Sequence, residues 1–106
     1  MTPSFCEREN GERPFLEWLA SLRDARAALA VDRRLVRLRE GNLGDAKPVG
    51  EGVHELRIHY GPGLRVYFCH WGERVVILLA GGDKSSQRAD IERARAYRQD
   101  FARRNG

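Results

Sequence analysis

The sequence between residues 53 and 80 contains three strand-like runs joined by turns that are too short to hold a helix. Apolar and polar residues alternate in residues 53–60 and again in residues 64–71, which is the period of a strand with one buried face. Gly61-Pro62-Gly63 and Gly72-Glu73 separate the runs and are typical of hairpin turns. Because strands joined by hairpins pair antiparallel, this segment predicts an antiparallel sheet.

The third run, residues 75–80, is continuously apolar, which favours a strand that is buried on both faces in the middle of the sheet. Gly81 and Gly82 are predicted to end this strand. The first nine residues have room for a short edge strand, whereas residues 41–52 are rich in Gly, Pro and Asp and predict a loop. We therefore expect three to four strands.

Helices are predicted both before and after these strands in the sequence. The first begins near Pro14 and the second covers residues 24–40, where Gly41 ends it; the two are expected to form an antiparallel pair. A last helix, capped by Ser85 or Ser86, follows the sheet. The apolar positions of the first helix are Phe15, Trp18, Leu19 and Leu22, those of the second Ala28, Val31, Leu35 and Leu38, and those of the last Ile91, Ala94, Tyr97 and Phe101.

This order of elements predicts one domain over residues 1–106, because 106 residues are too few for two independent cores. The predicted class is α+β: a small antiparallel sheet with two N-terminal helices packed on it and a C-terminal helix.

The charge of the chain favours an anionic partner. The formal net charge is +4, and all of the 19 basic residues except Lys47 and Lys84 are arginine, whose planar fork grips phosphate through two hydrogen bonds. Residues 84–104 hold seven basic and three acidic residues, so this segment alone carries the net charge of +4. A nucleic acid and an acidic protein fit equally well, and a solvated helix face has the same composition.

Other sequence features narrow the function classes. Cys6 and Cys69 are too few for a disulfide framework, and no Cys or His spacing is typical of a metal site, so neither a metal nor another cofactor is expected. We find no signal sequence, and the longest apolar run is too short to cross a membrane, so a reducing cytoplasm and no membrane partner are expected.

One face of the predicted hairpin has residues suited to phosphoryl transfer. With a three-residue turn, Arg57, His59, Arg65 and Tyr67 share a solvent-facing surface, and the apolar residues share the other face. Arginines stabilise charge on a phosphorane, an imidazole moves protons at neutral pH, and tyrosine stacks on a base. The polar side of any half-exposed sheet has a similar composition, and that interpretation stays open. The facing pairs are predicted to be Arg57–Tyr67, Ile58–Val66, His59–Arg65 and Tyr60–Leu64.

The segment after the third strand, Gly81-Gly82-Asp83-Lys84-Ser85-Ser86, leaves room for an anion at a helix N-terminus, and Lys84 is a candidate for binding phosphate. A tight turn with a serine cap is the alternative. Four further residues are candidates for contacting RNA, namely Lys47, Tyr67, Asp83 and Arg88.

Three motifs together give a resemblance to a known family. GVHELRIHYGPGLRVYF, ILLAGGDKSSQ and DIERARAY resemble the "addiction module killer" branch of the RelE/ParE/HigB toxins of type II toxin–antitoxin systems, over nearly the whole chain. The resemblance implies a RelE-like fold. It also implies metal-independent cleavage of mRNA, in which the 2′-hydroxyl attacks the adjacent phosphate, by an endoribonuclease that acts on the translating ribosome.

By position in these motifs, the resemblance makes Arg65 the arginine that stabilises phosphate and places Lys84, Arg57 and His59 where relatives carry basic catalytic residues. The tyrosine that some relatives carry in the last segment has no counterpart here, because Asp90 lies near its place. The paired lysines of the family strand are also absent. His59 as general acid or base is therefore a hypothesis.

Two other functions remain open at this point. The ParE branch of the same superfamily poisons DNA gyrase without catalysis, and a plain partner-binding module needs only the basic C-terminal end. The resemblance also implies an antitoxin, in this branch often a helix-turn-helix DNA-binding protein, besides mRNA and the ribosome as partners.

Overall fold

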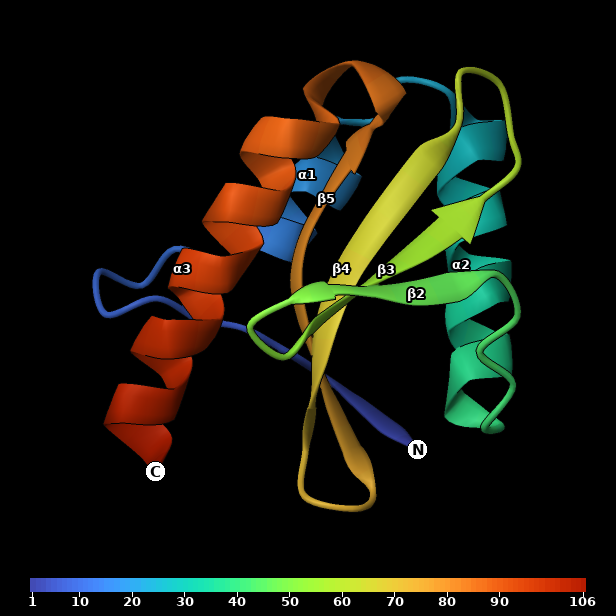
Figure 1. Ribbon diagram of the computed structural model, residues 1–106. Coiled ribbons are helices and arrows are strands. Elements are labelled where there is room, and N and C mark those ends of the chain that lie inside the picture. The colour runs from blue at the N-terminus through green and yellow to red at the C-terminus, as the bar shows by residue number, and fades with distance from the viewer.

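The chain folds around a five-stranded sheet with helices on both faces (Figure 1). The computed structural model describes residues 1–106. The strand order is β1-β5-β4-β3-β2; α1 and α2 cover one face, and α3 covers the other. The α+β class, with two N-terminal helices on the sheet and a C-terminal helix, is confirmed. In chain order the elements are β1 (Thr2–Phe5), α1 (Pro14–Ser21), α2 (Ala25–Arg39), β2 (Ala46–Gly50), β3 (Val53–Ile58), β4 (Leu64–Trp71), β5 (Val75–Asp83), a 3₁₀ turn (Lys84–Ser86) and α3 (Gln87–Asn105).

The sheet has more strands than predicted and is mixed rather than antiparallel. The edge strand expected in the first nine residues forms as β1, and it pairs parallel with β5. β2 lies in the segment predicted as a loop and pairs antiparallel with β3, with Lys47 opposite Glu55. An edge strand forms hydrogen bonds with one neighbour only, so β2 tolerates the Pro48 and Gly50 that obscured it in the sequence.

β5 also continues beyond its predicted end. Its residues 76–80 are buried, as predicted, but the strand lies between β1 and β4, and β4 is the middle strand. Gly81 and Gly82 do not end β5, since they pair with Val66 and Arg65. Both glycines allow close packing. A side chain on Gly81 would collide with the Trp18 ring, and a side chain on Gly82 would collide with the Asp90 carboxylate.

The helices begin close to their predicted positions but do not form the predicted antiparallel pair. α1 packs on β5, whereas α2 packs on β3 and reaches β1, where the Met1 ammonium donates to the Arg39 carbonyl at 2.8 Å. Their apolar stripes face the sheet instead of each other, because burial against two strands removes more apolar surface than one helix offers. The core on this face consists of Phe15, Ala27, Val31, Leu38, Leu56, Ile58, Leu64, Val66, Phe68, Val76 and Leu78.

A second, smaller core lies under α3, where Ala94 is buried and the Trp71 ring meets Phe101 at 4.9 Å between centroids. Ser86 stands at the N-cap of α3, but its hydroxyl donates to Asp90, and it is Asp83 that caps the preceding turn by accepting from the Ser85 amide. None of the helices is both long and apolar enough to cross a membrane.

Candidate functional site

The register of the β3–β4 hairpin differs from the predicted one by two residues. Arg57 pairs with Arg65 and Glu55 with Tyr67, so the predicted His59–Arg65 pairing is wrong. β3 ends at Ile58, and residues 59–63 form a wider turn, which is fixed by the Tyr60 hydroxyl donating to Asp24 at 2.6 Å. Because a shift of two residues keeps each side chain on its face of the sheet, the predicted division between the two faces survives.

Two rows of polar residues cross the sheet on the face that α3 covers. One row runs from Arg57 on β3 through Arg65 on β4 to Gly82 on β5. The neighbouring row is Lys47, Glu55, Tyr67 and Ala80. Both rows lie at the end of the sheet where α3 begins (Figure 1), and Gln87 in the first turn of α3 donates to Glu55.

Glu55 is the centre of these rows and was not singled out from the sequence. Its side chain is fully buried and accepts from Gln87 Nε2 at 2.8 Å, Arg57 Nε at 3.1 Å and the Tyr67 hydroxyl at 3.2 Å. Burial alone raises the pKa of the Glu55 carboxyl, but the hydrogen bonds from Gln87 and Arg57 and the charge of Arg65 outweigh burial and leave it below its ordinary value. Glu55 is therefore an ionised carboxylate that anchors two arginines.

Arg65 is less well satisfied than Arg57. Its side chain is only 12% exposed, and its Nε lies 3.7 Å from Glu55 Oε1, an ion-pair distance too long for a hydrogen bond. Arg65 Nε and Nη1 are both buried without a hydrogen-bond partner. Nη1 extends toward the 59–63 turn, 3.7 Å from where a side chain on Gly63 would begin. Arg65 thus holds a guanidinium that is largely desolvated and fixed in place between Glu55 and the 59–63 turn.

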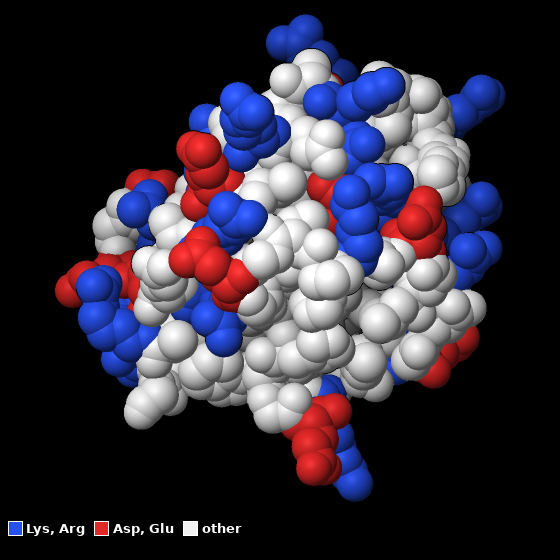
Figure 2. Space-filling view, viewed as in Figure 1, with Lys and Arg blue, Asp and Glu red and all other residues white.

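Three more predicted residues lie around these arginines. Lys84 is exposed, and its backbone amide donates to the Gly63 carbonyl at 3.1 Å, which places it beside the same turn. Asp83 ends β5, and hydrogen bonds from Ser85 lower the pKa of its carboxyl. Arg88 is exposed in the first turn of α3. Figure 2 shows Lys and Arg side chains over the upper part of this face, above the start of α3 and the ends of β3 and β5. We call Lys47, Arg57, Arg65, Lys84 and Arg88 the basic surface.

Tyr67 does not belong to the basic surface. The prediction that it faces solvent is wrong: it is fully buried under α3, and its hydroxyl is bonded to Glu55. Burial and the nearby Glu55 charge raise the pKa of Tyr67. A buried ring that already donates its hydroxyl has no face left for a base to stack on.

His59 is exposed and lies outside the paired residues of β3 and β4. Its side chain is 79% exposed, and its Nε2 lies 2.7 Å from Asp45 Oδ2. His59 lines a groove of about 320 Å³ between α2 and the end of β3. Arg57 lines the same groove and pairs with Glu55, so it connects His59 to the basic surface.

The α2 side of this groove adds arginines that were not singled out from the sequence. Arg33, Arg34 and Arg37 line the groove, and α2 as a whole has five arginines against Asp32, a net charge of 5 − 1 = +4. The positive charge is therefore not confined to the C-terminal end. The arginines of residues 33–39 can be read from the sequence, but acidic residues elsewhere in the chain cancel their charge in the net charge of the chain.

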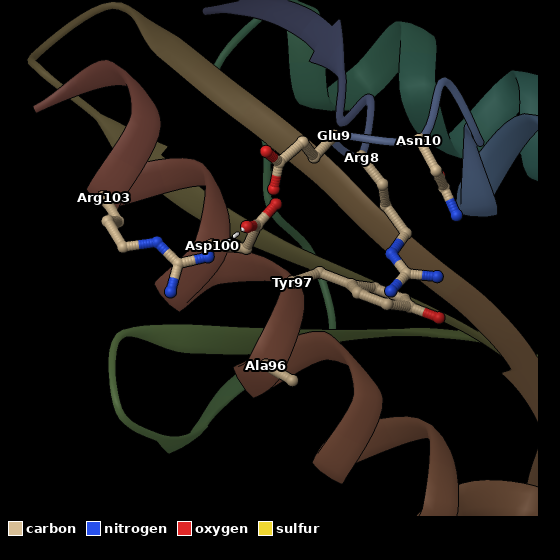
Figure 3. A pocket seen from close by; sticks show the side chains of 7 residues that line it. All are labelled: Arg8, Glu9, Asn10, Ala96, Tyr97, Asp100 and Arg103. Atoms are coloured by element: carbon tan, nitrogen blue, oxygen red, sulfur yellow. Dashed lines mark hydrogen bonds and ion pairs between the residues drawn. The ribbon is translucent and has the colours of Figure 1, made fainter.

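The largest hollow lies at the opposite end of α3. It measures about 480 Å³, and Figure 3 shows its walls, the β1–α1 loop and the C-terminal half of α3. Its arginines are already engaged: Arg8 lies over the Tyr97 ring at 5.2 Å, and Arg103 pairs with Asp100 at 2.7 Å. We therefore place the site at the basic surface. No group of three or more His, Cys, Asp or Glu side chains is arranged to hold a metal ion.

Comparison with known proteins gives two matches. Residues 17–101 match the family model described as "Phage derived protein Gp49-like (DUF891)". An "Uncharacterized protein" of Haemophilus influenzae (strain ATCC 51907 / DSM 11121 / KW20 / Rd) is 45% identical over 87 residues, which cover 82% of this chain and 88% of the relative. The family match includes the two polar rows, all of α2 and most of α3.

Proposed function

Because the chain belongs to the Gp49-like family of phage-derived proteins, we propose that it is the toxin of a type II toxin–antitoxin pair and cleaves mRNA at the basic surface. Three features support this proposal: the motifs shared with addiction-module toxins, the family match, and the cations gathered around Glu55. An antitoxin follows as a partner, with mRNA on the translating ribosome as the substrate.

Arg65 carries the proposal. A surface arginine that serves only solubility has its guanidinium in water, whereas the Arg65 side chain is 12% exposed and lies 3.7 Å from the buried Glu55 carboxylate. The guanidinium is therefore held in one orientation beside the 59–63 turn. Phosphate has the geometry and the charge for this fork, and Lys84 beside the turn adds a second cation.

The proposed reaction needs only the chain and the RNA. The 2′-hydroxyl of one nucleotide attacks its own 3′-phosphate, losing its proton to the imidazole of His59. The bond from phosphorus to the 5′-oxygen of the next nucleotide breaks, and that oxygen takes up a proton from water. The products are a 2′,3′-cyclic phosphate and a free 5′-hydroxyl. Arg57, Arg65 and Lys84 stabilise the added charge on the phosphorane.

The local geometry of His59 suits the role of general base. When Nε2 donates to Asp45, the ring is oriented and Nδ1 remains as a free acceptor. We expect the His59→Ala variant to cleave mRNA about 100-fold or more slowly at neutral pH, the range for a lost general base. Unchanged cleavage would remove His59 from the mechanism and leave the role of the arginines intact.

The experiment is induced expression followed by mapping of RNA 5′ ends, with Arg65→Ala and Arg74→Ala as matched variants. Arg74 is exposed in the β4–β5 turn, far along the strands from Arg65. The wild type and Arg74→Ala are expected to arrest growth and to produce the same new 5′ ends. Arg65→Ala is expected to lose both effects while its circular dichroism spectrum is unchanged. An unchanged transcriptome together with inhibited DNA supercoiling would decide for a gyrase poison instead.

A further inference from the structure

The 59–63 turn has a second hollow on the side away from α3. This hollow measures about 410 Å³ and lies between the turn and the α1–α2 connection. Leu22, Ala27 and Leu64 form apolar parts of its wall, and Tyr60 forms another part. A volume of this size is in the range of small-molecule sites, and a mainly apolar wall suits a flat aromatic ring.

Two carboxylates provide the polar groups of this hollow. Asp24 has both oxygens engaged, by the Tyr60 hydroxyl at 2.6 Å and the Arg26 amide at 2.9 Å. Asp83 uses only Oδ1, which accepts from Ser85, and its Oδ2 has no hydrogen-bond partner. The hollow therefore repels phosphate and offers a free acceptor to a group that carries N–H donors.

The hollow and the basic surface lie on opposite sides of one turn. Arg65 Nη1 lies against Gly63, and the Lys84 amide is bonded to the Gly63 carbonyl. Asp83, which lines the hollow, is the chain neighbour of Lys84. A phosphate held beside Gly63 by Arg65 and Lys84 thus lies across the 59–63 turn from the hollow.

We propose that this hollow is a nucleobase pocket that prefers guanine and holds the nucleotide on the 5′ side of the cut. The inference rests on the proposed function, since it takes the phosphate at Arg65 to be the 3′-phosphate of that nucleotide. Guanine presents two adjacent N–H groups on its Watson–Crick edge, and both can donate to the one free carboxylate oxygen, Asp83 Oδ2. Adenine and cytosine present an amino group next to an unprotonated ring nitrogen, and uracil presents one N–H between two carbonyls. Arg23 at the wall adds a donor for the guanine carbonyl.

The test measures binding of the 3′-monophosphates of guanosine, adenosine, cytidine and uridine by NMR titration. The wild type is expected to bind the guanosine nucleotide about tenfold more tightly than the uridine nucleotide, at the lower end of the range for discrimination between bases. In Asp83→Asn this ratio is expected to fall to about two or less. Asp32→Asn, a change on the outer face of α2, is expected to keep the wild-type ratio. Inorganic phosphate is expected to bind the wild type and both variants equally.

Equal affinity for the four nucleotides, no binding of any of them, or a guanine preference that survives in Asp83→Asn would overturn the pocket. The outcome is distinguishable from failure of the nuclease proposal. Guanine-selective binding by a protein that cuts no RNA keeps the pocket and removes the nuclease. RNA cleavage without a guanine on the 5′ side of the cuts keeps the nuclease and removes the pocket.

Discussion

The two faces of the sheet are formed by the same strands but bury different kinds of residue. The face under α1 and α2 buries a cluster of eleven apolar residues. The face under α3 has a smaller apolar cluster at one end and, at the other, the buried Glu55 with the arginines that it anchors. The first face removes apolar surface from water, which is the main source of stability in a domain of this size.

The second face holds charges where removing them from water is costly. A buried ion pair contributes little net stability, because the loss of hydration offsets the attraction between the charges. What it does provide is a guanidinium that stays in one place. The comparison teaches that stability and chemistry are assigned to opposite faces, and it predicts that substitutions on the two faces have separable effects.

The largest effect on stability is expected on the apolar face. Leu56→Ala removes a fully buried side chain between the sheet and the helices. We expect the free energy of unfolding to fall by about 2–5 kcal/mol in urea titrations, while cleavage per folded molecule is kept. Leu29→Ala, at a position that is 47% exposed, is the control and is expected to change it by less than about 0.5 kcal/mol. Equal effects of the two changes would contradict the assignment of this face to stability.

A smaller and pH-dependent effect is expected at Glu55. Glu55→Gln leaves two arginines without their anion, so we expect a loss of about 1–3 kcal/mol at neutral pH together with loss of RNA cleavage. The folded pKa of Glu55 is lowered, so its contribution is complete above the unfolded pKa of about 4.3 and disappears as the pH falls through the folded value.

Urea titrations across the acid range check this prediction. The stability difference between the wild type and Glu55→Gln is expected to shrink as the pH falls below about 4.3. Glu73→Gln, in the exposed β4–β5 turn, is expected to match the wild type at every pH. A difference between the wild type and Glu55→Gln that grows toward acid pH would mean that Glu55 is protonated in the native protein.

The smallest effect is expected at Tyr67. Tyr67→Phe keeps the buried ring and removes one of the hydrogen bonds to Glu55. We expect the free energy of unfolding to fall by about 0.5–1.5 kcal/mol, and RNA binding in filter assays to stay the same. The control is Tyr97→Phe, whose ring lies in the hollow at the other end of α3. Weakened RNA binding with an unchanged free energy of unfolding would mean that Tyr67 contacts RNA after all.

The sequence predicted the parts of the fold that depend on local periodicity. Phe15 and Trp18 marked α1, and the alternation in residues 53–71 placed Leu56 and Val66 on the apolar face. The same alternation placed Arg57 and Arg65 together, but it does not determine what covers a face. The burial of Glu55 and Tyr67 therefore could not be predicted, since it depends on the position of α3.

The length of the turn after β3 could not be predicted for a different reason. Gly61-Pro62-Gly63 is compatible with turns of three and of five residues, and the Tyr60–Asp24 contact with α2 selects the longer one. In the longer turn, His59 lies outside the paired residues of β3 and β4 and lines the groove beside α2. Long-range contacts of this kind have no signature in the local sequence.

Cleavage of one mRNA on purified ribosomes, with and without a single 2′-deoxynucleotide on the 5′ side of the cut, tests the proposed chemistry most directly. We predict that the all-ribose message is cut and leaves a 2′,3′-cyclic phosphate, whereas the deoxy-substituted message stays whole at that position. Cleavage of the deoxy-substituted message at the same bond, or failure to cut either message, would contradict attack by the 2′-hydroxyl at the basic surface.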